Sequence, residues 1–236
     1  MHAFHKEILQ KLQLKEKKVK LDFNVAKYLG TQSGYLNLST GEFKKIIKEW
    51  AKLHKDIQLD DFIALLLSFN NGKTFQEKAA VGDLLIAFPK LRRTMDPDLL
   101  DKLLENRQGW AEIDVLCQSA FDSEEILENW KKWEALLKKF VSSKNISKRR
   151  ASLVLLTKSV RHSPDEKLAK MAFSNIQKLQ TEREILITKA VSWLLRSLTT
   201  NYPKAVGQYL EKHKDLLPAI AYRETKTKLE TGRKTK

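Results

Sequence analysis

The sequence is poor in residues that interrupt helices. Glycine occurs 8 times and proline 5 times in 236 residues, and the alternating valine and threonine runs of strands are nearly absent. Apolar residues instead recur at helical spacing along almost the whole chain. Because a half-buried strand needs a period of two residues, this pattern argues against a β-rich protein and predicts an all-α fold.

Cysteines and long apolar runs are also scarce. Cys117 is the single cysteine and has no partner in the sequence, which excludes a disulfide framework and fits a reducing cytoplasm. No apolar stretch approaches the roughly 20 residues that a membrane span requires. The N-terminal segment MHAFHKEILQKLQLKEKK lacks the apolar core of a signal peptide. We therefore expect a cytoplasmic protein without a membrane partner.

Several catalytic and cofactor motifs are missing as well. The five histidines are scattered without the spacing of a metal site. The chain contains no P-loop, no GxGxxG fingerprint and no GxSxG elbow. We therefore expect neither a metal nor a cofactor.

Positive charge is abundant. Lysine and arginine number 44 against 29 acidic residues, a formal net charge of +15. A charge of this size indicates a polyanionic partner, and nucleic acid fits better than a membrane surface.

Short breaks divide the chain into helices that come in pairs. Each pair takes roughly 35 to 40 residues, a period typical of HEAT and armadillo solenoids. We predict such a solenoid with a concave basic cleft; a compact irregular helical domain is the alternative. The segments expected to be helical are 1–20, part of 22–41, 42–54, 59–70, 74–88, 96–105, 110–121, 124–142, 147–161, 165–179, 182–200 and 203–213.

The helical pattern is expected to form a single domain over residues 1–222, followed by a tail over 223–236. The tail, RETKTKLETGRKTK, carries six basic residues against Glu224 and Glu230. This composition predicts a flexible basic segment. It either adds nonspecific affinity for DNA or is simply a solvated end.

The segment 182–200 carries an unusual mixture on one face. Lys189, Trp193 and Arg196 share a face by their spacing, away from the apolar stripe of the same helix. Trp193 either packs on a neighbouring repeat with an exposed edge or forms an aromatic wall flanked by cations that bind phosphate.

A second mixed face lies on the segment 110–121. Trp110 and Asp114 are four residues apart, and no lysine or arginine lies three or four residues from Asp114. Asp114 either bridges to a basic residue of another repeat, such as Arg149, or stabilises a developing cation and positions a water. Arg149 is expected to snorkel or to pair with a carboxylate, and Arg150 to contact phosphate.

Together these segments resemble the AlkC/AlkD group of DNA alkylation repair proteins. The resemblance covers roughly residues 20–222 and is carried by YLGTQSGYLNLSTGEFKKI at 28–46, GWAEIDVLCQSAF at 109–121, RRAS at 149–152 and KAVSWLLR at 189–196. It implies a DNA glycosylase of HEAT-like repeats that hydrolyses the N-glycosidic bond of cationic N3- and N7-alkylated purines in double-stranded DNA. No cofactor is implied, and we expect a monomer that is associated with the bacterial nucleoid when bound to DNA.

The resemblance also implies roles for particular residues. Trp110, Asp114 and Trp193 would form the catalytic cluster, with Arg149 and Arg196 on the DNA backbone and Tyr28 in support. Some members of the group act from the backbone side, and the chain shows no obvious base pocket, so we expect catalysis without base flipping. Beside these residues, Lys189 and Arg150 are expected to bind DNA.

Two other functions remain open. The chain departs from the pattern of the group at Asn37, Ser39, Thr40, Ala111 and Ser192. Some members of the group bind DNA, including branched DNA, and excise nothing, so a noncatalytic DNA-binding solenoid is the main alternative. A protein-interaction scaffold is the other, although a scaffold has no need of a lone aspartate among cations.

Overall fold

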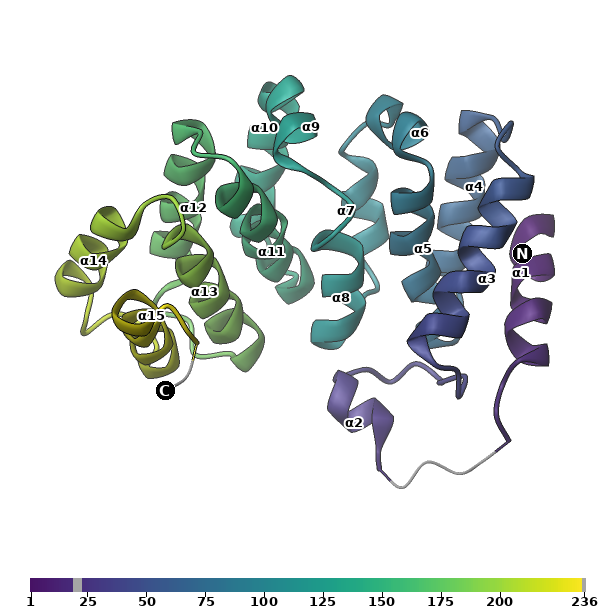
Figure 1. Ribbon diagram of the computed structural model, residues 1–236, viewed down its shortest axis with the longest axis horizontal. Coiled ribbons are helices and arrows are strands. Elements are labelled where there is room, and N and C mark those ends of the chain that lie inside the picture. Colours follow the sequence, from purple (N-terminus) through teal and green to yellow (C-terminus); the bar gives the residue numbers. More distant parts are fainter. Residues whose placement is uncertain (19–22, 235–236) are drawn as a thin grey trace. The chain divides into compact units, whose positions relative to one another are not determined.

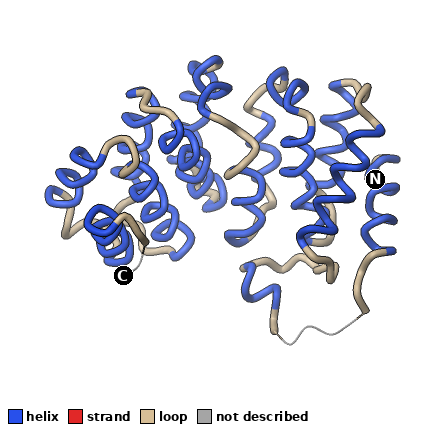
Figure 2. Tube along the Cα trace, in the orientation of Figure 1, coloured by secondary structure: helices blue, strands red, loops and turns tan. Residues whose placement is uncertain are grey.

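The computed structural model describes residues 1–18 and 23–234. Its regular structure over these residues consists of 15 α-helices (Figure 1), with no strand beyond an isolated bridge between Gly34 and Thr74. Figure 2 shows the same succession of helices and short loops. The all-α prediction and its helical repeat class are therefore confirmed. None of the helices in this part of the chain is long and apolar enough to span a membrane.

The chain divides into two compact units, Met1–Ala120 and Phe121–Lys236. Unit 1 contains α1 (Ala3–Leu14), α2 (Val25–Leu29), α3 (Thr40–Leu53), α4 (Leu59–Asn70), α5 (Phe75–Ala87), α6 (Pro89–Thr94), α7 (Leu99–Leu104) and α8 (Gly109–Cys117). Unit 2 contains α9 (Ser123–Glu128), α10 (Trp130–Val141), α11 (Ile146–His162), α12 (Glu166–Leu179), α13 (Ile185–Leu198), α14 (Pro203–Lys212) and α15 (Ala219–Thr231). The division thus falls after Ala120 and not after residue 222.

Each helix packs mainly on the helices that follow it in the chain. In unit 1, α3, α5 and α8 form one row, while α1 packs on α3 and α4, and α4 packs on α5. In unit 2, α11, α13 and α15 form a corresponding row against which α10, α12 and α14 pack. Packing between near neighbours in sequence is how solenoid repeats bury their apolar faces. Fully buried aromatic side chains, Trp50, Phe62 and Phe69 in unit 1 and Trp133 and Phe140 in unit 2, occupy these cores.

Polar side chains set where many helices begin. The Ser39 and Thr74 hydroxyls each accept a backbone N–H three residues on, and Thr74 forms a full capping box with Glu77. The Asp122 side chain caps α9 in the same way, whereas the side chains of Asn145 and Asp165 cap α11 and α12 by accepting the backbone N–H two residues on. Such a cap stabilises a helix by about 1 kcal/mol. The starts that the apolar period predicts for these helices lie close to the observed ones.

Some helix boundaries differ from the prediction. The segment 124–142 is not one helix, because Asn129 leaves helical geometry (φ −117°, ψ 35°) and separates α9 from α10. The predicted break at 89–94 is the short helix α6, which Pro89 can open because the first helical position needs no N–H. The first helix ends at Leu14 rather than at residue 20, and residues 19 and 20 lie outside the described part.

The prediction of a disordered tail from Arg223 is wrong for residues 223–231, which belong to α15. Ala221 and Thr225, one turn apart, are fully buried against the rest of unit 2. Gly232 ends the helix in the left-handed conformation (φ 72°) and donates its N–H to the Lys228 carbonyl. A stripe of two small residues is weaker as a sequence signal than a leucine stripe, which explains the error.

Candidate nucleic-acid interface

Two glycines hold the start of α8 against the end of α2. Gly30 follows α2 with φ 70°, and Gly109 opens α8 with φ 64°. A Cβ on Gly109 would lie 2.2 Å from the Gly30 carbonyl oxygen, so a larger residue would displace the backbone. This close approach brings Tyr28 beside Trp110.

The Trp110 indole is oriented by this contact. Its Nε1–H donates a 2.8 Å hydrogen bond to the Tyr28 carbonyl oxygen. The two rings meet edge to face, with centroids 5.7 Å apart and planes at 89°, a favourable arrangement for aromatic pairs. The Trp110 side chain stays half-buried and Tyr28 is 64% exposed, so both rings are available to a ligand.

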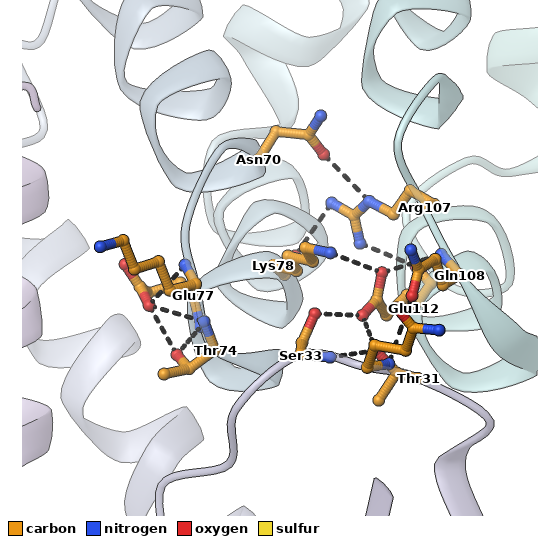
Figure 3. Close-up of polar contacts among 11 residues, drawn as sticks. Thr31, Ser33, Asn70, Thr74, Glu77, Lys78, Arg107, Gln108 and Glu112 are labelled. Atoms are coloured by element: carbon orange, nitrogen blue, oxygen red, sulfur yellow. Dashed lines mark hydrogen bonds and ion pairs between the residues drawn. The ribbon is translucent and has the colours of Figure 1, made fainter.

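Glu112, two residues after Trp110 on α8, is fully buried. Its Oε1 accepts hydrogen bonds from the Thr31 hydroxyl and, at 2.7 Å, from the Ser33 hydroxyl. Its Oε2 accepts the Gln108 backbone N–H at 2.9 Å and pairs with the Lys78 ammonium at 3.0 Å (Figure 3). These contacts join the loop after α2 to both α5 and α8, and so support the position of Trp110.

Burial disfavours the charges of this network, and hydrogen bonds and ion pairs oppose that effect to different extents. Burial raises the pKa of the Glu112 carboxyl, but hydrogen bonds from Thr31, Gln108, Ser33 and Lys78 outweigh burial and hold its pKa below the ordinary 4.5. Burial lowers the pKa of the nearby Arg107 guanidinium to about 10. Arg107 donates to the Asn70 side chain at 3.0 Å and to the carbonyl oxygens of Glu112 and Lys78 at 2.7 and 3.0 Å (Figure 3). Glu112 and Arg107 therefore have a structural role.

Asp114 lies one helical turn after Trp110 on α8. Both residues belong to the same uninterrupted helix, as their spacing predicts. Asp114 is only 7% exposed. Most of its side chain is therefore shielded from solvent within unit 1.

Four of the predicted residues line one cavity in unit 2. Its volume is about 380 Å³, and it is lined by Arg150 of α11, Lys189, Trp193 and Arg196 of α13, and Ile220, Glu224 and Lys234. Arg150 also donates to the Leu186 carbonyl oxygen in the first turn of α13. Trp193 is half-buried and Lys189 exposed. The cavity therefore presents an aromatic ring among cationic groups.

Glu224 brings α15 to this cavity. Its carboxylate accepts the Ser192 hydroxyl at 2.6 Å and pairs with Arg196 at 3.4 Å and with Lys234 at 3.3 Å. The Arg196 Nε–H also donates to the Ser192 hydroxyl oxygen at 3.3 Å. Burial lowers the pKa of the Arg196 guanidinium, and the Glu224 charge partly offsets that effect. The Glu224 carboxylate thus lies among cations that would otherwise be free to bind a phosphate.

Arg149 does not line the cavity. Its guanidinium pairs with Glu182 at 2.9 Å and donates to the Ser143 and Lys144 carbonyl oxygens, both at 2.9 Å. Of the two environments expected for this arginine, pairing with a carboxylate is the one observed. Arg149 thereby fastens the start of α11 to the segment before α13.

The predicted residues therefore form two groups. Tyr28, Trp110 and Asp114 belong to unit 1, and Arg149, Arg150, Lys189, Trp193 and Arg196 to unit 2. Sequence reasoning missed Glu112 and Glu224, whose partners Thr31 and Ser192 lie 81 and 32 residues away. No sequence signal marks such pairings. Among the described residues, no group of three or more His, Cys, Asp or Glu side chains could hold a metal ion.

The chain is similar to known proteins of one family. The chain matches the family described as DNA alkylation repair enzyme over residues 8–229. No curated protein sequence matches it. A solved structure, described as a predicted DNA alkylation repair enzyme from Enterococcus faecalis, is similar with a TM-score of 0.73 at 16% identity, covering 87% of this chain and 93% of that one. That similarity shows a shared fold. Because the family match extends over most of its length, the chain belongs to the DNA alkylation repair enzyme family.

Proposed function

We propose that the protein is a monofunctional DNA glycosylase that releases cationic N3- and N7-alkylated purines from double-stranded DNA. Family membership supports a role in the repair of alkylated DNA. The observation that carries the finer proposal is the unit 2 cavity, in which Trp193 lies with Arg150, Lys189 and Arg196. An aromatic face among cations suits a sugar that develops positive charge next to phosphates.

The cations would bind the DNA backbone. Lys189 and Arg150 offer ammonium and guanidinium donors at the cavity, and Arg196 lies beside them. Phosphate contacts of this kind position a duplex without reading its sequence. Arg149 and Tyr28 would also contact DNA, Tyr28 through its exposed ring.

The reaction mainly requires the protein to stabilise the positive charge that develops on the sugar. An alkylated purine already carries a positive charge, so the bond from C1′ to the purine nitrogen breaks with its electron pair moving to the departing base. The faces of Trp110 and Trp193 would stabilise the oxocarbenium-like sugar, and the Asp114 carboxylate would add a full negative charge. Asp114 would also orient the water whose oxygen attacks C1′ while its proton passes to solvent.

This mechanism acts from the sugar side of the damaged nucleotide. It needs no pocket for an extruded base, so we propose that excision proceeds without base flipping. The protein would act as a monomer in the cytoplasm, without a metal or a cofactor.

The test is excision of 7-methylguanine and 3-methyladenine from methylated duplex DNA. Wild type should release free base, and Asp114→Asn should lose most of the release while still binding duplex. Asp56→Asn, which changes an exposed carboxylate in the turn before α4, is the matched control and should retain full activity. Excision that survives in Asp114→Asn would remove Asp114 from the mechanism. Tight binding of duplex or branched DNA by wild type without any release would identify a noncatalytic DNA-binding protein instead.

A further inference from the structure

A larger hollow lies in unit 1, formed by residues of α3, α5, α6 and the turn after α3. Its volume is about 880 Å³. None of the residues assigned above to the candidate interface lines it. Its lining consists of Lys44, Ile47, Lys48, Ala51, Lys52, Lys55, Ile57, Asp83, Ile86, Ala87, Phe88, Pro89, Lys90 and Leu91. We call this hollow the lysine groove.

The rim of the lysine groove is strongly basic. Lys44, Lys48 and Lys52 follow one another at four-residue spacing on α3, and Lys55 and Lys90 extend the rim beyond that helix. All five are exposed. Like charges at this spacing repel, at a cost of about 0.2–0.5 kcal/mol for each pair.

Several lysines on other helices are offset by an acid on the same helix. Lys11, Lys138 and Lys170 each pair with a glutamate four residues earlier, at 2.8, 2.6 and 2.9 Å. On α3 itself, Lys45 pairs with Glu49 at 3.9 Å. The groove lysines, by contrast, form no ion pair within 4.0 Å in the part of the chain that the structure describes. Lys44 interacts electrostatically with Asp83 at longer range. A row of cations without close ion pairs beside a hollow points to an anionic partner.

The residues on the floor of the groove indicate which kind of anion binds there. Ile86 is 44% exposed there, beside Ile47 and Leu91. A DNA backbone would gain nothing from this apolar surface. The half-buried Asp83 carboxylate, which lines the same groove, disfavours any anion beside it, so the carboxylates of a partner must lie along the lysine rim. An acidic peptide with apolar anchors would use both the lysine rim and the apolar floor.

The length of the rim favours a peptide over a small molecule. Lys44 to Lys52 spans about 12 Å at a rise of 1.5 Å per residue, which matches about two turns of a partner helix. We propose that the lysine groove docks an acidic amphipathic helix of another protein. Apolar side chains of that helix enter between α3 and α5, and its carboxylates pair with the lysines. The inference stands independently of the glycosylase proposal.

The probes are fluorescein-labelled acidic peptides of about 16 residues, near the length at which isolated helices become stable. Each carries leucines at helical spacing among glutamates, and a scrambled peptide of identical composition is its control. Anisotropy should show saturable binding of the amphipathic peptides and much weaker binding of the scrambled ones. Duplex DNA is added as a competitor.

Two variants locate the binding site. Ile86→Glu removes an apolar anchor, and the double variant Lys48→Glu/Lys52→Glu reverses charge on the rim. Each should weaken peptide binding about tenfold or more, equivalent to about 1.4 kcal/mol. The control Lys178→Glu/Lys204→Glu makes the same charge change at exposed positions in unit 2 and should bind as wild type does. Thermal unfolding of each variant confirms that it is folded.

The remaining outcomes overturn the proposal. Equal binding of the scrambled peptides would reduce the interaction to charge alone. Displacement of the peptide by duplex DNA, with DNA affinity lost in Lys48→Glu/Lys52→Glu but kept in Ile86→Glu, would make the groove part of a DNA interface. An absence of saturable peptide binding would leave no role for the apolar floor. Base excision is measured on the same variants, and its presence or absence does not affect these outcomes.

Discussion

The indole N–H of Trp110 donates to the main-chain carbonyl of Tyr28 at 2.8 Å, across 82 residues of sequence. The acceptor belongs to the backbone, so substitution of the Tyr28 side chain leaves the bond possible. The close contact between Gly30 and Gly109, the first residue of α8, positions that carbonyl group. The orientation of a proposed catalytic ring thus depends on two glycines and on the buried ion pair that Glu112 of the same helix forms with Lys78.

Gly109→Ala should destabilise unit 1 and disturb Trp110. The added Cβ would meet the Gly30 carbonyl at 2.2 Å, at a residue with φ 64°. We expect a loss of about 1–3 kcal/mol in the free energy of unfolding, measured by urea denaturation. Gly41→Ala is the matched control, because a Cβ there meets nothing within 4 Å; it should leave stability unchanged or slightly raised. Equal stability of the two variants would contradict the proposed contact.

Glu112→Gln should be strongly destabilising. The amide keeps some hydrogen bonds but leaves the Lys78 ammonium, 3.0 Å away, without its counter-charge in a buried site. We expect a loss of about 3 kcal/mol, near the lower end for breaking a buried pair. Glu134→Gln, which removes the charge from an exposed pair with Lys138, should cost at most about 1 kcal/mol. A similar small loss in both variants would show that the network contributes little.

Stability should fall in mild acid. Glu77 and Glu112 both have pKa values below the ordinary 4.5 in the folded protein, so the unfolded chain binds protons more readily at these sites. Their contribution is present above the unfolded pKa and is lost as the pH falls through the lower folded pKa. Urea midpoints between neutral pH and pH values below 4.5 should therefore decrease, and less steeply in Glu112→Gln. The same pH slope in wild type and variant would assign the acid sensitivity to other groups.

Glu224→Gln should strengthen DNA binding. The change removes a carboxylate that pairs with Arg196 and Lys234 in the unit 2 cavity, so both cations become available to phosphates. We expect a gain in duplex affinity of roughly three- to tenfold and a steeper dependence on salt. Glu230→Gln makes the same charge change on α15, where Glu230 pairs only loosely with Lys226 at 4.0 Å. Duplex affinity is measured by anisotropy titrations at several salt concentrations. Equal affinities and salt dependences of Glu224→Gln and Glu230→Gln would contradict the prediction.

Trp193→Ala should weaken the interaction with DNA. Trp193 lines the unit 2 cavity among four cationic side chains, and loss of an aromatic contact to nucleic acid costs about 1–3 kcal/mol. Both duplex affinity and single-turnover release of 7-methylguanine should therefore decrease. Trp130→Ala, at a half-buried position on α10 outside the cavity, should leave both unchanged. Normal binding and release by Trp193→Ala would make Trp193 a packing residue.

Much of the local structure was predictable. The apolar period and the short breaks between helices are local signals, and they predicted most helices within a few residues. The caps Ser39, Thr74 and Asp165 are local too. The grouping of Lys189, Trp193 and Arg196 followed from the same period, since all three lie on α13. The failures have local causes too, because Asn129 and the small residues of α15 carry weak signals.

The sequence by itself determined the all-α fold, the excess of positive charge and the helix faces that carry Trp110, Asp114 and Trp193, because periodicity and composition need no knowledge of distant contacts. Only the tertiary structure decided that Arg149 pairs with Glu182, that Glu224 faces Arg196, and that Glu112 is buried against Thr31 and Lys78. It also decided that the α3 lysines border an apolar groove. Pairings of this kind depend on how helices pack, and a charge in the sequence does not say which distant side chain will neutralise it.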